Sequence, residues 1–140
     1  GCRPFAIAEG MRPDPSTWSS LELAPTSDDG PVTVIHMMKF APGGLADGMA
    51  KYQEKAGRLV KKYGGGPVAM FEVEGTIMGD GREWDQVRFV SYPSLRAFFA
   101  MVNDPERTEA QGDHRNRALE YTYTVVVRAT IDSFVTNGAV

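Results

Sequence analysis

The chain has 140 residues, of which 42% are hydrophobic and 24% charged, with a formal net charge of −3; these values predict one globular domain with roughly two-thirds of its unfolded surface buried. Because there is no excess of positive charge and no base-stacking motif, we expect no nucleic-acid partner. No run of about 18 apolar residues occurs, so we expect no membrane span and a cytoplasmic protein.

Residues 1–30 predict an arm ahead of the main domain. They hold four of the nine prolines, and Asp14, Pro15 and Ser16 predict the start of one short helix. Cys2 is the single cysteine, which excludes an intrachain disulfide and a cysteine-based zinc site. We expect an arm over 1–30, an α+β domain over 31–134 and a tail over 135–140.

The next elements are a strand over 31–40 and a helix over 47–63. Both alternating sets of the strand are mostly apolar, which predicts that both of its faces are covered. The helix has an apolar stripe at helical spacing and a basic outer side; the stripe consists of Met49, Tyr52, Ala56, Leu59, Val60 and Tyr63. Glycines 64–66 predict the end of the helix.

A hairpin follows, with a strand over 68–78, a turn over 79–82 and a third strand that ends at Tyr92. One face of this hairpin is apolar, and we expect it to lie under the helices; it carries Phe71, Val73, Val87 and Phe89. The other face is mixed and carries Val68, Met70, Trp84, Val90 and Tyr92.

The last part of the chain predicts a helix from Ser94, a second short helix at Asp104-Pro105 and a strand over 121–131. Ser94 is a favourable N-cap, and the amphipathic stripe after it is the cleanest in the chain; it consists of Leu95, Phe98, Phe99 and Val102. The last strand is rich in Tyr, Thr and Val.

This order of elements, β-α-β-β-α-β, predicts a ferredoxin-like α+β fold with a four-stranded antiparallel sheet and both helices on one face. The other face would then expose a large apolar patch. We expect a second copy of the sheet to cover it, giving a homodimer formed through the face of Trp84, Val90 and Tyr92.

Several short motifs resemble a known family when they are taken together. They are Asp28-Asp29-Gly30-Pro31-Val32, His36-Met37-Met38-Lys39-Phe40, Tyr63-Gly64-Gly65, Trp84-Asp85, Tyr92-Pro93-Ser94, the 98–102 run, Asp104-Pro105-Glu106 and His114-Arg115. From about residue 14 onward the chain is similar to the bacterial domain-of-unknown-function family thirteen-thirty, of the dimeric α+β barrel superfamily. The resemblance implies a dimeric α+β barrel, in a superfamily that includes cofactor-free monooxygenases, muconolactone isomerases and haem-dependent peroxidases. Two positions depart from the pattern: His36 replaces an expected asparagine, and Arg107 replaces a frequent tyrosine.

The candidate catalytic residues are His36, Arg88 and His114. Either imidazole could act as a general base near neutral pH, and each could instead be a structural hydrogen-bonding residue. Arg88 could clamp an anionic substrate or pair with a glutamate on the neighbouring strand. No metal-binding spacing of the two histidines occurs, so we expect no metal. We expect no cofactor, although one histidine could still bind haem.

The candidate substrate-binding residues are Glu74, Trp84, Tyr92 and Arg115. Glu72 and Glu74 share a strand face and could act as an acid and a base, or lie at a barrel rim. Trp84 and Tyr92 could line a ligand site or anchor the dimer. We expect a site between the sheet and the helices, lined by His36, Glu74, Arg88 and Tyr92, with His114 and Arg115 at its mouth.

Two functions fit these residues. The first is a cofactor-independent oxygenase or isomerase that acts on a small anionic or aromatic metabolite in the barrel cavity. The second is a non-catalytic homodimeric module that binds a small ligand or has a structural role. What separates the two is whether His36, Glu74 and Arg88 converge on one cavity or satisfy one another.

Overall fold

A computed structural model describes residues 30–44, 49–107 and 118–130. Its elements follow in the order β1 (Val32–Phe40), α2 (Ala50–Lys62), β2 (Gly66–Glu72), β3 (Gln86–Tyr92), α3 (Leu95–Val102) and β4 (Leu119–Val127). Cys2, the short helix expected near residues 14–16 and the tail expected over 135–140 lie outside these residues.

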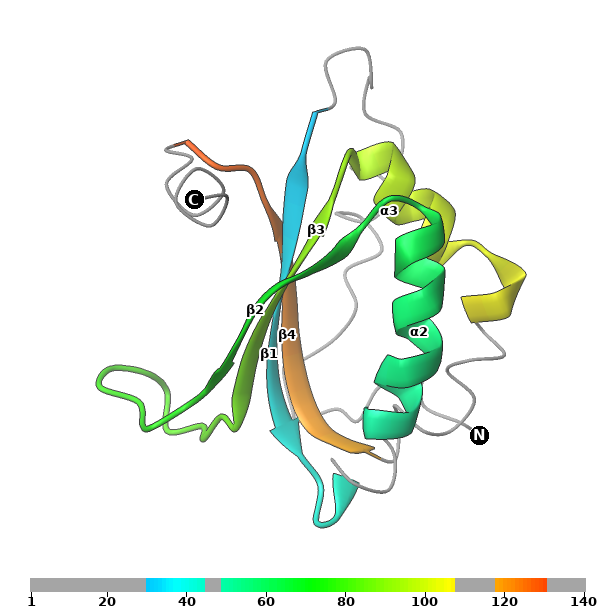
Figure 1. Cartoon of the computed structure of the whole chain (residues 1–140). Coiled ribbons are helices and arrows are strands. Elements are labelled where there is room, and N and C mark those ends of the chain that lie inside the picture. The colour runs from blue at the N-terminus through cyan, green and yellow to red at the C-terminus, as the bar shows by residue number, and fades with distance from the viewer. Residues whose placement is uncertain (1–29, 45–48, 108–117, 131–140) are drawn as a thin grey trace.

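The four strands form one sheet in the order β2-β3-β1-β4, and every neighbouring pair is antiparallel. Both α2 and α3 lie on the same side of this sheet (Figure 1). The predicted ferredoxin-like α+β fold, with its antiparallel four-stranded sheet and its helices on one face, is therefore confirmed.

Helix α3 forms as its sequence predicts. The Ser94 hydroxyl accepts a hydrogen bond of 3.0 Å from the Ala97 N–H and so caps the first turn. Leu95, Phe98 and Phe99 are buried against the sheet, and Val102 packs at the edge of the same cluster. The predicted docking stripe of this helix is thus confirmed.

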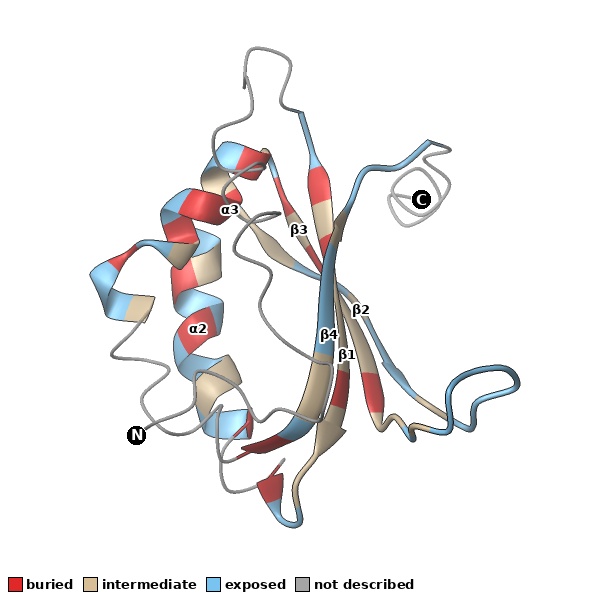
Figure 2. Cartoon of the chain, turned by 180° about the vertical axis from the view of Figure 1, so that it is seen from behind, coloured by how far each residue is buried: buried red, intermediate tan, exposed pale blue. Residues whose placement is uncertain are grey.

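Helix α2 presents an apolar side to the sheet and a basic side to solvent. Ala56 and Leu59 are buried, whereas Lys51, Lys55 and Arg58 are exposed (Figure 2). The helix ends at Lys62, after which Gly64 adopts a φ of 82° and donates a 3.0 Å hydrogen bond to the Lys61 carbonyl. A residue with a Cβ rarely adopts that left-handed conformation, so the glycine run ends the helix as predicted.

The two sides of the third strand are the reverse of what the sequence predicts. Val90 and Tyr92 are buried under the helices, together with Val32, Val34 and Phe98. Val87 and Phe89 alternate with them and therefore face the other side of the sheet, opposite Met37 and Ile35 of β1. The expected dimer surface through Val90 and Tyr92 is wrong, because both faces of β3 carry large apolar side chains and alternation alone does not say which face the helices cover.

The second strand is shorter than predicted, since it ends at Glu72 and not at residue 78. Beyond Glu72, one further hydrogen bond joins the Val73 N–H to the Asp85 carbonyl at 3.0 Å. Trp84 then packs on Tyr121 and Tyr123 of β4, with ring centroids 5.2 and 4.9 Å apart. Because these contacts draw residues 83–84 across the sheet toward β4, pairing with β2 stops, and residues 73–85 form a long loop, which we call the arm loop.

Candidate functional site

A row of polar side chains crosses the helix-covered face of the sheet and divides its core in two. One buried cluster contains Val34, Val90 and the α3 side chains, and the other contains Met38, Met49 and Leu119. Strand register places His36 between Val34 and Met38 on β1, directly opposite Arg88 on β3 and Thr124 on β4. We call Arg88, His36 and Thr124 the polar row.

The three members of the polar row differ in their exposure to solvent. Arg88 and His36 are half-buried, whereas Thr124 is exposed at the β4 edge of the sheet. The Thr124 hydroxyl and His36 Nδ1 share a hydrogen bond of 3.3 Å, which holds the imidazole ring in one orientation. The row therefore runs from solvent at β4 inward to the guanidinium of Arg88.

Arg88 is a cation without a counter-charge in the described part of the chain. Its Nε is buried and has no hydrogen-bond partner there, and no carboxylate of the described residues forms an ion pair with it. Burial lowers the pKa of Arg88 below its ordinary value, and the nearby Tyr52 and Tyr92 oppose that shift. A buried donor without a partner is unfavourable, and a bound anion would supply the missing acceptor.

Two glutamines from the elements around Arg88 also carry buried polar atoms without partners in the described structure. Gln86 precedes Arg88 by two positions on β3, so the two side chains share a face, and its Oε1 has no donor. Gln53, on α2 beside Tyr52, has the same condition at Nε2. Native structures leave few such atoms unsatisfied, and these three lie on elements that face each other.

Tyr92 adds a phenol to the same region. Its ring packs edge-to-face on Phe98 with centroids 5.2 Å apart, and the residue is buried. Burial, followed by the neighbouring Tyr52, raises the pKa of Tyr92 far above its ordinary value, and the charges of Arg88 and Arg107 oppose that shift. Tyr92 is therefore a neutral hydrogen-bonding group at neutral pH, and the charge of Arg107 also influences it.

Glu74 and Trp84 lie apart from this group. Glu74 is exposed in the arm loop. It comes two positions after Glu72, where β2 ends, whereas Arg88 is opposite Met70 within the paired part of the sheet. Trp84 packs on Tyr121 and Tyr123 and so lies on the face away from the helices.

The structure thus brings together His36, Arg88 and Tyr92 of the predicted site residues. His114 and Arg115 lie outside the described residues. Within the described ranges, no group of three or more His, Cys, Asp or Glu side chains is arranged to hold a metal ion, and no helix is long and apolar enough to cross a membrane.

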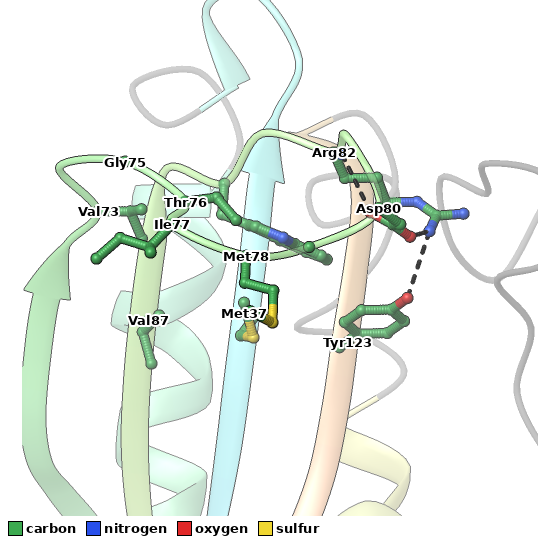
Figure 3. A pocket seen from close by; sticks show the side chains of 12 residues that line it. Met37, Val73, Gly75, Thr76, Ile77, Met78, Asp80, Arg82, Val87 and Tyr123 are labelled. Atoms are coloured by element: carbon green, nitrogen blue, oxygen red, sulfur yellow. Dashed lines mark hydrogen bonds and ion pairs between the residues drawn. The ribbon is translucent and has the colours of Figure 1, made fainter.

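A separate pocket of about 650 Å³ lies on the opposite face of the sheet, beneath the arm loop (Figure 3). Met37, Val87 and Tyr123 form its floor from three strands, and the arm loop passes across them. The Arg82 guanidinium bonds the Asp80 carboxylate and donates to the Tyr123 hydroxyl at 3.4 Å. This pocket and the polar row are on opposite sides of one sheet.

Sequence reasoning identified His36, Arg88 and Tyr92 but missed Tyr52, Gln53 and Gln86. One signal was present in the sequence: Gln86 and Arg88 occupy alternate positions that continue the buried pair Val90 and Tyr92 along β3. Polar residues at the buried positions of a strand indicate a site more strongly than polar residues elsewhere, because buried polar groups need partners. Tyr52 and Gln53 could not be found in this way, because their relation to β3 depends on how α2 lies on the sheet.

The fold makes the chain a ferredoxin-like α+β protein, and several solved structures are similar to it. A protein of unknown function from Rhodopseudomonas palustris matches with a TM-score of 0.70 at 24% identity, over 84% of this chain and 95% of its own. A NIPSNAP-like domain protein from Burkholderia xenovorans matches at 0.49 and 15% identity, over 74% and 88%. A protein from Bacteroides fragilis, described as dimeric and ferredoxin-like, matches at 0.47 and 20% identity, over 71% and 97%. No protein-family model matches the chain, and no curated protein matches it significantly.

Proposed function

We propose that the protein binds a small carboxylate-bearing metabolite at the polar row and moves a proton on it. The observation that carries the proposal is Arg88, whose buried Nε has no partner and whose charge has no carboxylate beside it in the described part of the chain. A guanidinium binds a carboxylate through two parallel hydrogen bonds. Such a ligand would enter from the β4 edge, where Thr124 is exposed.

The chemistry follows from the neighbours of Arg88. His36 is directly opposite it on β1, so an acid bound to the guanidinium would present its adjacent carbon to the imidazole. His36 takes the proton from a carbon next to a carbonyl, the electron pair moves onto the carbonyl oxygen, and Arg88 stabilises the resulting enolate. Return of the proton at another carbon completes an isomerisation, and reaction of the same carbanion with molecular oxygen begins an oxygenation.

Titration calorimetry with a panel of 2-oxo acids, benzoates and unsaturated lactone acids tests the binding step. A binder should also raise the melting temperature of the protein by mass action. Arg88→Met should weaken the best binder at least about tenfold, the effect of losing roughly 1.4 kcal/mol. Arg58→Met removes the same charge from the exposed side of α2 and should leave affinity unchanged. Equal affinity in both variants would remove Arg88 from the site.

Proton transfer has its own readout. In deuterium oxide, a bound 2-oxo acid or unsaturated lactone acid should exchange its activated C–H for C–D, which proton NMR follows as a loss of signal. His36→Gln should abolish exchange while keeping most of the affinity, since Arg88 still holds the carboxylate. Binding without exchange in the unmodified protein would favour the second function, a ligand-binding module without catalysis.

We further propose that the protein is a homodimer in which the open face of the sheet, the one away from the helices, packs on a second copy. Among the residues that the structure describes, six of the eight exposed large hydrophobic side chains support this, because they lie on that face or on the arm loop: Phe71, Ile77, Met78, Tyr123, Val125 and Val127. Two sheets of this kind pack face to face about 10 Å apart. The motifs that resemble the bacterial domain-of-unknown-function family thirteen-thirty support the same assembly, and we propose that the chain is a divergent member of it.

A further inference from the structure

The arm loop over 73–85 has a firmly held base. The Tyr121 hydroxyl donates to the Glu83 carbonyl at 2.6 Å, and Trp84 packs between the rings of Tyr121 and Tyr123. The Asp85 carboxylate accepts from the Phe40 N–H at 2.8 Å. The loop is therefore anchored on both β1 and β4, and it stands out from the sheet on the side away from the helices (Figure 1).

The tip of the arm loop carries two large apolar side chains, Ile77 and Met78, which line the pocket beneath the loop and remain exposed there. Ile77 is 104% exposed and Met78 is 92% exposed, whereas Met70, the next most exposed large hydrophobic among the described residues, reaches 52%. Exposed loop tips ordinarily carry small or polar residues. Two exposed, large apolar side chains at the tip of an anchored loop are typical of a contact surface.

The surface beneath the tip is apolar too. Met37, Val87 and Tyr123 form the floor of the 650 Å³ pocket on one side of the loop (Figure 3), and the exposed Val125 continues the same face. One protomer thus supplies both an apolar projection and an apolar surface on the same side of its sheet. In a two-fold dimer, the arm loop of each copy can contact the open sheet face of the other, so the same two surfaces are used twice.

We infer that the arm loop of each subunit reaches across the dimer and packs Ile77 and Met78 against the open sheet face of the second copy. This inference rests on the proposed homodimer. A partner that covers the open face must also contact the arm loop, because the loop projects from that face. A second copy would contact it through an apolar sheet surface of the same kind. The anchored base keeps the loop in place before association, so little conformational freedom is lost on binding.

Photo-crosslinking tests the inference directly. Met78 is replaced by p-benzoylphenylalanine, and the variant is mixed with ¹⁵N-labelled unmodified protein, refolded from denaturant and irradiated. Mass spectrometry then separates crosslinks within one chain from those between a light and a heavy chain. We expect light-to-heavy crosslinks that map to the peptides of β1, β3 or β4 on the open face. The matched control carries the photoprobe at Lys55, on the outer side of α2, and should give no light-to-heavy crosslink.

A second variant measures what the contact contributes. Ile77→Ser with Met78→Ser should weaken the dimer at least about tenfold in sedimentation equilibrium, and Thr76→Ser on the same loop should not. A dimer that shows only crosslinks within one chain, or keeps its affinity in the double variant, overturns the arm contact but leaves the sheet-to-sheet dimer intact. A chain that sediments as a monomer overturns both, while the anion site at Arg88 is tested by its own calorimetry.

Discussion

Asp104 shows how one buried carboxylate ties α2 to the end of α3. It accepts hydrogen bonds from the Tyr63 hydroxyl at 2.6 Å, the Glu106 N–H at 2.9 Å and the Lys62 ammonium at 3.1 Å. The Tyr63 bond, then the Glu106 N–H and then Lys62 hold the pKa of Asp104 below its ordinary value of 3.8. Lys62 is largely exposed, so its ion pair is screened by solvent and contributes less than the phenol.

The lowered pKa of Asp104 predicts a pH dependence of stability. A carboxyl group whose pKa is lower in the folded state stabilises the fold above its unfolded pKa and loses that contribution as the pH falls through the folded value. Urea unfolding at pH 2.5–7 should therefore show a constant advantage of the wild type over Asp104→Asn above about pH 5, and a shrinking advantage below about pH 4. Glu120→Gln controls for the loss of one negative charge. An advantage of unchanged size down to pH 2.5 would contradict the assignment.

Arg88 predicts an opposite kind of result, in which a substitution stabilises the protein. Its guanidinium is half-buried with an unsatisfied Nε in the described structure, and methionine keeps an apolar stem without the charge. Arg88→Met should raise the unfolding free energy of the ligand-free protein by about 1 kcal/mol, a typical penalty for an unsatisfied buried donor. Arg58→Met should change it by less than about 0.5 kcal/mol. A clear loss of stability in Arg88→Met, measured by urea unfolding, would make Arg88 a structural residue.

At the level of single residues, the sequence predicted the members of the site better than their arrangement. The sequence indicates His36 and Arg88 as polar residues in apolar strands, but their position opposite each other depends on the β1–β3 register. The separation of Glu74 from Arg88 depends on where β2 ends, and contacts made by Trp84 on a distant strand determine that point. Local patterns carry no information about either.

At the level of elements, helix α3 packs on the sheet through the stripe that its sequence predicts. Phe98 is 7% exposed and contacts the rings of both Tyr92 and Phe99, with centroids 5.2 and 5.1 Å away. Phe98→Ala should therefore lower the unfolding free energy by about 3–5 kcal/mol, from lost burial and the cavity left behind. Ala100→Ser, on the exposed side of the same helix, is the control. A loss below about 1 kcal/mol for Phe98→Ala would mean that the ring is not part of the core.

Gly44 makes a second prediction at this scale, at the junction between the end of β1 and the start of β4. A Cβ placed on Gly44 would lie 2.2 Å from the Ala118 carbonyl oxygen, and that carbonyl accepts a 2.8 Å bond from the Ala41 N–H. Gly44→Ala should thus force two backbones apart and lower the melting temperature by several degrees, the effect of about 1–2 kcal/mol in a domain of this size. Gly57→Ala, with open space around its Cβ, should not lower it. Equal melting temperatures would contradict the close approach.

The elements also show where periodicity is sufficient and where it is not. The stripe of α3 has one apolar side, so its orientation follows from the sequence alone. Strand β3 has large apolar side chains on both sides, and alternation separates Val87 and Phe89 from Val90 and Tyr92 without saying which pair lies under the helices. Packing of the whole core decides that question, and it buries Val90 and Tyr92 under the helices.

For the whole molecule, the open face of the sheet predicts association. Interfaces of ordinary size bury about 800 Å² on each partner, a small part of the 9187 Å² that the chain exposes. Val125→Asp places a charge on the open face of β4 and should convert the dimer to a monomer at micromolar concentration in sedimentation velocity. Met70→Asp places the same charge on the helix side of the other edge strand, at similar exposure, and should leave the dimer intact. A chain that is monomeric without substitution would contradict the dimer.

The whole fold was predictable because its pattern is spread over six elements, each of which needs only local signals. The candidate site was only partly predictable because it lies where three strands and α2 come together. The strongest evidence for it is a set of buried polar atoms without partners in the described structure: Arg88 Nε, Gln53 Nε2 and Gln86 Oε1. Those atoms become informative only when their surroundings are known. The proposed function therefore depends on a few polar side chains in a largely apolar core.

The measurement that tests the central claim most directly is a crystal structure of the protein with the tightest carboxylate binder from the calorimetric panel. We expect the carboxylate oxygens within about 3 Å of the Arg88 guanidinium, the activated carbon facing His36, and Tyr52 and Tyr92 beside the ligand. A ligand bound instead in the pocket beneath the arm loop, or an Arg88 paired with a carboxylate of its own chain, would contradict the claim.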